Sequence, residues 1–224
     1  MARKLRDEPS ARERLLAAAS ELFYAEGVHS VGIDRVIERA GVAKATLYSA
    51  FGSKDELIRA YLQARDAAIR DRLTHELAAR YQTARERVVG VFEVQGLSFT
   101  EPDFRGCPFT CASAEARPGS AAEHAAEEHR AWIRSLFLDL AREAGAADPE
   151  RLAQQLFLLY DGAAVSAWLD GDPGVATAAQ AAAAALVDAA SGTAKGRPRT
   201  PTSVAASRSR PTSGGRKASA SAPA

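Results

Sequence analysis

The sequence holds 224 residues, of which 46% are hydrophobic and 7% aromatic, and its formal net charge is +1 at pH 7. A chain of this length can bury one good-sized core plus a small additional domain. Abundant Ala and Leu, few aromatic residues and long stretches without Pro or Gly favour helices over strands, so we expect an all-α fold. The charge distribution excludes a uniformly basic nucleic-acid binder, because seven basic residues and no acid follow Asp188 and the rest of the chain is net acidic.

The cysteines and the apolar stretches indicate the compartment. Cys107 and Cys111 lie four residues apart, and no secretory signal is recognisable, which favours a reducing cytoplasm over a disulfide framework. The longest uncharged apolar stretch, residues 173–187, is shorter than the ~20 residues that a bilayer span requires. We expect a cytoplasmic protein without a membrane helix or a membrane partner.

Three short helices are predicted at the N-terminal end. Ser10 and Glu13 have the spacing of a capping box, which opens the first helix. The second helix ends at Gly41, which can adopt the left-handed conformation of a tight helix exit. The three helices are expected at residues 10–27, 33–41 and 44–50.

A longer helix and five more helices are predicted after them. Ser53 and Glu56 form another capping box, and the helix that they open could continue to about Arg80. From Gly192 the composition changes to Ser, Ala, Thr, Pro and basic residues, which cannot repay the entropy of ordering, so the tail is predicted to be disordered. Breaks containing Pro or Gly place the later helices at residues 83–99, 108–116, 120–144, 149–170 and 173–190.

Residues 31–51 place two short helices around a glycine-containing turn, which is the arrangement of a helix-turn-helix. An exposed second helix can enter a DNA major groove about 12 Å wide, with its first residues nearest the base edges. The polar residues available on that helix are Lys44, Thr46, Tyr48 and Ser49.

Together with residues 52–57, this run resembles the signature of the TetR family of transcriptional regulators. In that signature the helix-turn-helix ends in a Tyr, here Tyr48, followed after a two-residue gap by Phe51 and then by Lys54 at the start of the fourth helix. The resemblance covers about residues 10–57. It implies a homodimer that reads a near-palindromic operator in double-stranded DNA, usually as a repressor that a small-molecule effector, here unidentified, releases.

The resemblance also implies roles for single residues. Thr46, Tyr48 and Lys54 match family positions that touch phosphates. Ala45 and Ser49 match positions that approach base edges.

Two positions depart from the family pattern. Gly32 and Ala43 stand where the family often has Ser or Thr, so side-chain caps of the second and third helices are expected to be absent. Ser30 could cap the second helix instead if that helix begins earlier. Small side chains on the third helix offer few bidentate base contacts. Direct readout is therefore expected from Arg35, Lys44 and Ser49.

Most of the large aromatic residues fall between residues 99 and 168, where they either line an effector cavity or form the core. Residues 104–109 also resemble a motif that a subset of TetR-like regulators carries near the effector pocket. Cys107, Tyr160 and Asp161 are the polar or polarisable groups expected to orient the effector. The predicted pocket residues are Phe99, Cys107, Phe109, Trp132, Phe157, Tyr160, Asp161 and Trp168.

The last two predicted helices, within residues 149–190, combine Leu with many Ala residues, and small residues let helices approach closely. In a TetR-like chain the equivalent pair forms a four-helix bundle with its copy, so these helices are the predicted dimer interface; packing within the monomer is the alternative. The basic tail either adds non-specific DNA affinity or is an inert extension. The predicted parts are an N-terminal extension (1–9), a three-helix helix-turn-helix DNA-binding domain (10–56), a helical ligand-binding and dimerisation domain (57–191) and the tail (192–224).

Other chemistries find less support. Cys107, Cys111, His124 and His129 have the formal spacing of a zinc finger, but two histidines five apart on a helix point about 140° apart, so no metal is expected. A thiol redox switch lacks an evident neighbouring cation. The sequence shows no phosphate-binding loop and no nucleophile motif, so neither a cofactor nor an enzymatic activity is expected. The alternative to a regulator is a helical adaptor that binds protein without DNA specificity.

Overall fold

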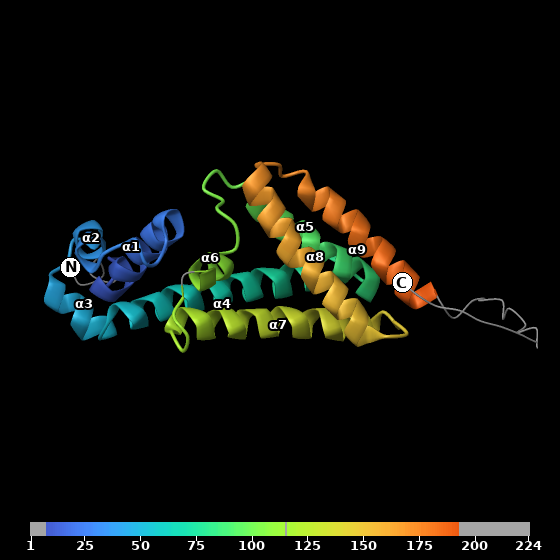
Figure 1. The fold of residues 1–224 in the computed structure, drawn as a ribbon, viewed down its shortest axis with the longest axis horizontal. Helices are drawn as coiled ribbons and strands as arrows, with labels where there is room; N and C mark the ends of the chain where they lie inside the picture. Colours follow the sequence, from blue (N-terminus) through green and yellow to red (C-terminus); the bar gives the residue numbers. More distant parts are fainter. Residues whose placement is uncertain (1–7, 115, 193–224) are drawn as a thin grey trace, which may run out of the picture. The chain divides into compact units, whose positions relative to one another are not determined.

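The computed structural model describes residues 8–114 and 116–192, and within these ranges it holds α-helices and no strand, which confirms the all-α prediction (Figure 1). Gly192, the first residue of the predicted tail, is the last residue of α9; the rest of that tail and most of the predicted N-terminal extension lie outside the described residues. Among the described helices, none combines the length and hydropathy needed to span a bilayer. The helices are α1 (Ala11–Glu26), α2 (Ile33–Ala40), α3 (Lys44–Phe51), α4 (Lys54–Arg80), α5 (Ala84–Phe99), α6 (Pro108–Ala114), α7 (Ala121–Glu143), α8 (Pro149–Asp170) and α9 (Val175–Gly192).

Side-chain caps set where several helices begin. At α1, Ser10 and Glu13 form the complete capping box that the sequence predicts. At α4, the Ser53 hydroxyl accepts the Glu56 N–H at 3.1 Å, as predicted. The Glu56 carboxylate, however, pairs with Arg59 at 3.4 Å, so the reciprocal half of the predicted capping box is replaced by an ion pair within the helix.

Helices α6 and α9 differ from their predicted bounds by two residues, and the other helices by at most one. α9 begins at Val175, two residues late, because the Asp172 carboxylate accepts the Gly174 N–H at 2.7 Å and holds a turn before the helix. α6 ends at Ala114, two residues before its predicted end.

Two apolar cores hold the described helices together. The N-terminal core gathers buried side chains of α1, α2, α3 and the beginning of α4, among them Leu15, Val36 and Leu47, together with side chains of α6 and of the first turns of α7. The second core gathers α5, α7, α8 and α9 around Phe92 and Phe137, whose ring centroids lie 5.7 Å apart. Each core buries enough apolar surface to fix the elements around it.

Helix α4 contributes to both cores. Its first turns bury Leu57 and Tyr61 in the N-terminal core, and its last turns bury Leu73 and Leu77 in the second core. The predicted domain boundary between residues 56 and 57 therefore falls inside a continuous helix. Because close-packed side chains transmit displacements, a movement of α4 affects both cores.

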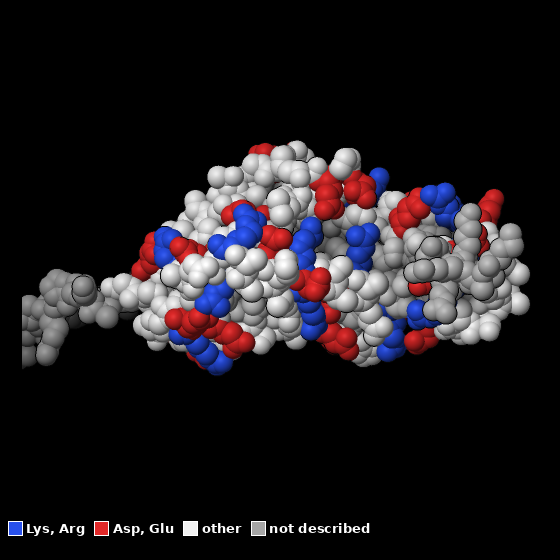
Figure 2. Space-filling view, turned by 180° about the vertical axis from the view of Figure 1, so that it is seen from behind, with Lys and Arg blue, Asp and Glu red and all other residues white. Residues whose placement is uncertain are grey.

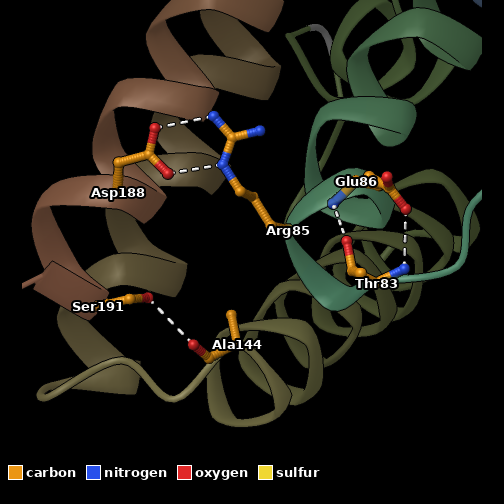
Figure 3. Close-up of polar contacts among 6 residues, drawn as sticks. All are labelled: Thr83, Arg85, Glu86, Ala144, Asp188 and Ser191. Carbon is orange, nitrogen blue, oxygen red and sulfur yellow. Dashed lines mark hydrogen bonds and ion pairs between the residues drawn. The ribbon is translucent and has the colours of Figure 1, made fainter.

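Helix α9 is held on the second core by close packing and by polar contacts. A Cβ atom at Gly96 would lie 2.4 Å from the Cβ of Ala176, so the glycine lets α5 and α9 approach closely. In Figure 3, Arg85 of α5 donates two hydrogen bonds, 2.6 and 2.8 Å long, to the carboxylate of Asp188 on α9. The Ser191 hydroxyl donates to a carbonyl just after α7 at 3.0 Å, which ties the end of α9 to a third helix.

Candidate nucleic-acid interface and ligand cavity

The turn between α2 and α3 is built on Gly41. Its φ of 63° lies in the left-handed region, and its N–H donates to the carbonyls of Ile37 and Glu38. The Val42 N–H also donates to the Ile37 carbonyl, at 3.1 Å. These bonds end α2 at Ala40, and only three residues separate it from α3, which begins at Lys44; this is the predicted helix-turn-helix.

Helix α3 has a buried and an exposed face. Leu47 and Phe51 pack into the N-terminal core, whereas Tyr48 keeps 45% of its surface exposed. An exposed helix face fixed from behind by a packed core is suited to enter a major groove. The predicted DNA-contacting residues lie on accessible surface: Arg35, Lys44, Ala45, Tyr48 and Ser49 are exposed, and Thr46 and Lys54 are half-buried.

Two of the predicted basic contacts are paired with acidic side chains. Lys44 Nζ lies 2.9 Å from Asp34 Oδ1, and this pairing raises the pKa of Lys44. Arg35 pairs with Glu26 of α1. More than half of each basic side chain is exposed, so water screens both pairs and a phosphate can replace the carboxylate at small cost. On the face in Figure 2 the described acidic and basic side chains are likewise interspersed.

Lys54 lies at the beginning of α4. Its ammonium group donates to the carbonyl of His29, in the connection between α1 and α2, at 3.4 Å. Partial burial lowers the pKa of Lys54. This hydrogen bond holds the Lys54 side chain against the connection between α1 and α2.

Neither α2 nor α3 has a side-chain cap. Gly32 and Ala43 occupy the N-cap positions, and no side-chain hydrogen bond caps either helix, as the sequence predicts. The alternative cap, Ser30, is wrong, because α2 begins at Ile33 and its N-cap is Gly32.

Comparisons with known proteins decide the family. Residues 15–61 match the family model described as bacterial regulatory proteins, tetR family. A solved TetR-family transcriptional regulator from Streptomyces coelicolor is 36% identical with a TM-score of 0.76, and the match covers 81% of this chain and 96% of that chain. The chain belongs to the TetR family. A putative TetR transcriptional regulator from Streptomyces avermitilis is also 36% identical, with a TM-score of 0.72, over 81% of this chain and 98% of that chain.

Curated relatives match over shorter segments. The HTH-type transcriptional activator FasR of Mycolicibacterium smegmatis is 52% identical over 52 residues, which are 23% of this chain and 24% of FasR. The HTH-type transcriptional regulator SrpR of Pseudomonas putida is 38% identical over 66 residues, 29% of this chain and 31% of SrpR. The chain thus matches less than a third of the length of these two relatives.

A cavity of about 400 Å³ lies against α4 in this TetR-family chain. Side chains of α1, α4, α5, α7 and α8 line it, together with the connection that precedes α6. A cavity of this size suits a drug-sized ligand. Three of the predicted pocket residues line it, namely Phe99, Cys107 and Tyr160.

Phe109 and Trp132 do not line this cavity. Phe109 is fully buried, and its ring stacks on His129 with ring centroids 3.9 Å apart. Trp132 lies under the guanidinium of Arg70, 5.0 Å from the ring centroid. Phe109 therefore supports the cavity wall through His129, and Trp132 packs against α4 outside the lining.

Phe157, Asp161 and Trp168 also lie outside the lining. The guanidinium of Arg130 covers the Phe157 ring at 4.6 Å and pairs with Asp161 at 2.8 Å, so both residues are engaged by α7. Trp168 is 46% exposed, although its ring lies 3.3 Å from where a Cβ would stand on Gly106. Trp168 therefore contacts the cavity wall at Gly106 without lining the cavity itself.

Polar residues that the sequence did not indicate as pocket residues also line the cavity: Tyr24, Arg65, Arg72, Gln95, Ser98, Glu101 and His129. The Tyr24 hydroxyl accepts the Arg105 N–H at 2.9 Å and donates to the Gly106 carbonyl at 3.0 Å. A side chain of α1 is thereby bonded to the loop that precedes α6. No pattern in the sequence marks this long-range contact, which spans 82 residues.

His129 of α7 is buried and bonded to α4. Its Nδ1 atom lies 2.8 Å from Asp66 Oδ1, so the neutral ring donates from Nδ1 and keeps Nε2 as an acceptor. Burial lowers the pKa of His129, against the opposing effects of the Asp66 hydrogen bond and charge. His124, five residues earlier on the same helix, is exposed. The two histidines thus face different surroundings.

The buried His129 predicts a loss of stability in mild acid. Because its folded pKa is lowered, the unfolded chain binds the proton more tightly, so the free energy of unfolding falls as the pH drops below about 6.5, the ordinary value. Urea unfolding between pH 8 and pH 5 measures this loss. His129→Gln should flatten the profile in this range, whereas His124→Gln should leave it as in the wild type. Equal profiles for wild type and His129→Gln would contradict the assignment.

Proposed function

We propose that this TetR-family chain is a transcriptional regulator that binds an operator in double-stranded DNA through α3. The observation that carries the proposal is the exposed face of α3, where Tyr48 and Ser49 face solvent while Leu47 is buried behind them. Polar side chains on a helix fixed by a core can meet base edges in one defined register.

The proposed contacts divide into two kinds. Contacts to phosphates position the protein and give its salt dependence, and contacts to base edges give its sequence preference. Arg35 and Lys44 add base contacts when DNA displaces their acidic partners. The phosphate contacts are Thr46, Tyr48 and Lys54, and the residues near base edges are Ala45 and Ser49.

We propose α8 and α9 as the homodimer interface. On α8, Leu158, Val165 and Leu169 are 64%, 40% and 69% exposed and share one helix face. Gly162 lies in the same stripe, and nothing packs within 4 Å of where its Cβ would stand, so a second helix can approach closely. α9 adds exposed alanines such as Ala181. A second copy of the stripe is the natural cover for this apolar surface.

We propose that a small-molecule effector binds in the cavity and changes the spacing of the two α3 helices of the dimer. Tyr24 of α1 and several residues of α4 line the cavity, so a ligand there contacts elements of the N-terminal core. A coupling of about 1–3 kcal/mol would change DNA affinity by about 5- to 150-fold. The proposed direction is release of a repressor, although family membership alone does not fix it, since FasR is named as an activator.

Lys54→Ala should weaken binding to operator DNA uniformly across sequences. Removing one phosphate contact reduces the slope of log affinity against log salt by about 1. Fluorescence anisotropy with a labelled operator, measured at several salt concentrations, gives this slope. Arg142→Ala, which removes an exposed cation at the far end of α7, is the matched control and should leave the slope unchanged. The same isotherms for Lys54→Ala and wild type would count against the interface.

Leu158→Asp and Val165→Asp should convert the dimer to a monomer, because a carboxylate would be buried without a partner in an apolar interface. Light scattering after size exclusion measures the molar mass. Leu97→Asp changes an exposed leucine on α5, outside the stripe, and this control variant should keep the molar mass of a dimer. If the α8 variants remain dimers with wild-type thermal unfolding, the interface lies elsewhere.

A further inference from the structure

The charged groups around the cavity do not cancel. Arg72 pairs with Glu101, with 3.7 Å between the charged atoms. Arg65 also lines the cavity, and no described acidic side chain forms an ion pair with it. His129 of α7, which also lines the cavity, is buried next to Asp66, and burial lowers its pKa. The lining therefore carries one half-buried positive charge without a counterion.

Two aromatic rings hold this free cation in place. The guanidinium carbon of Arg65 lies 4.6 Å from the ring centroid of Tyr24 and 5.8 Å from that of Tyr61. Such contacts engage the face of the guanidinium and leave N–H groups at its edge for an anion. A planar carboxylate or a sulfonate can accept two of these N–H groups at once.

The rest of the lining is mostly apolar, with one unused acceptor. Ile69, Leu73, Val94 and Phe99 contribute hydrocarbon surface. Gln95 is buried, and its Nε2 donates to the Tyr160 carbonyl at 2.9 Å, whereas its Oε1 is buried without a hydrogen-bond partner. An unpaired buried acceptor costs free energy until a donor reaches it. Because almost none of the Oε1 surface is accessible, this acceptor lies beneath the lining, and the cavity favours a ligand with a largely apolar body.

We propose that the cavity binds an amphipathic organic anion, with Arg65 as the residue that pairs with its negative group. This inference rests on the proposed function only in taking the cavity as the effector site. An apolar body fills the space along α4 and α5, and the anion meets Arg65. A cation would be repelled by Arg65, and a neutral ligand would leave the guanidinium without a counterion.

The contacts of Arg65 also indicate how binding of such an anion would affect the N-terminal core. The Tyr24 ring that packs against Arg65 belongs to α1, and the hydroxyl of the same residue bonds the loop at Arg105 and Gly106. An anion that draws Arg65 toward the cavity changes its contact with Tyr24. Binding of an anion at Arg65 is therefore coupled to α1, the helix that packs against the helix-turn-helix.

Two dyes that differ in one charged group test the proposal. Anilinonaphthalene sulfonate is an amphipathic anion, and phenylnaphthylamine is the same ring system without the sulfonate. Their binding to the full chain is followed by fluorescence titration in the absence of DNA. We expect the wild type to bind the sulfonate, and Arg65→Met to weaken that binding about tenfold or more while binding of the neutral dye changes less than twofold.

Further variants separate the cavity from other apolar surfaces. Arg65→Lys keeps the charge and should retain part of the preference for the sulfonate. Arg59→Met, an exposed change on the same helix, should affect neither dye. Ala68→Trp fills the cavity from an exposed position of α4 and should abolish binding of both dyes.

Several results would overturn the proposal. They are a wild type that does not bind the sulfonate, an Arg65→Met variant that loses both dyes equally or neither, and an Ala68→Trp variant that still binds the sulfonate. Because no DNA is present, a chain that failed to bind an operator could still pass this test. Failure of the proposed function and failure of this inference are thus distinguishable.

Discussion

The arrangement depends on α4, one helix of 27 residues that both cores share. Tyr61 near its beginning and Leu73 in its second half are each almost fully buried, in different cores. Close-packed interiors do not deform continuously, so α4 can move only if both cores repack or shift with it. The cavity lies along the stretch between these anchors, from Arg65 to Leu73. A ligand there acts on the part of α4 that connects the two cores.

Tyr24 adds a second connection of a different kind. Its hydroxyl bonds two backbone groups of the loop before α6, and its ring packs against Arg65. The bond from the Tyr24 hydroxyl to the Gly106 carbonyl is partly shielded from water, whereas the ion pairs beside α3 are exposed and screened. The interior contacts are therefore suited to carry a conformational change, and the exposed pairs are suited to exchange with DNA. His129 and Asp66 add a buried link between α7 and α4.

The sequence predicts the helices and the family well because those signals are local. The capping box at Ser10 and the left-handed turn at Gly41 depend on neighbours a few residues away, and both stand in the structure. The spacing of Tyr48, Phe51 and Lys54 likewise lies within one short segment. The structure and the comparisons confirm what these local patterns predict for fold and family.

The cavity could be predicted only in part because it depends on how each helix is rotated about its axis. Aromatic content alone could not show that Arg130 covers Phe157, or that Trp168 faces outward. The sequence also could not show that Tyr24 and Arg65 line the same cavity, because neither residue belongs to a recognisable motif. The exposed charge pairs beside α3 needed the structure for the same reason.

Selection of bound DNA from a random pool tests the central claim most directly, because it asks whether two copies of α3 read DNA together. The account predicts enrichment of an inverted repeat whose half-sites are centred about 10 base pairs, one turn of ~34 Å, or a multiple of this apart, with affinity that falls steeply with salt. Recovery of unenriched sequences, or of a single half-site without symmetry, would contradict it.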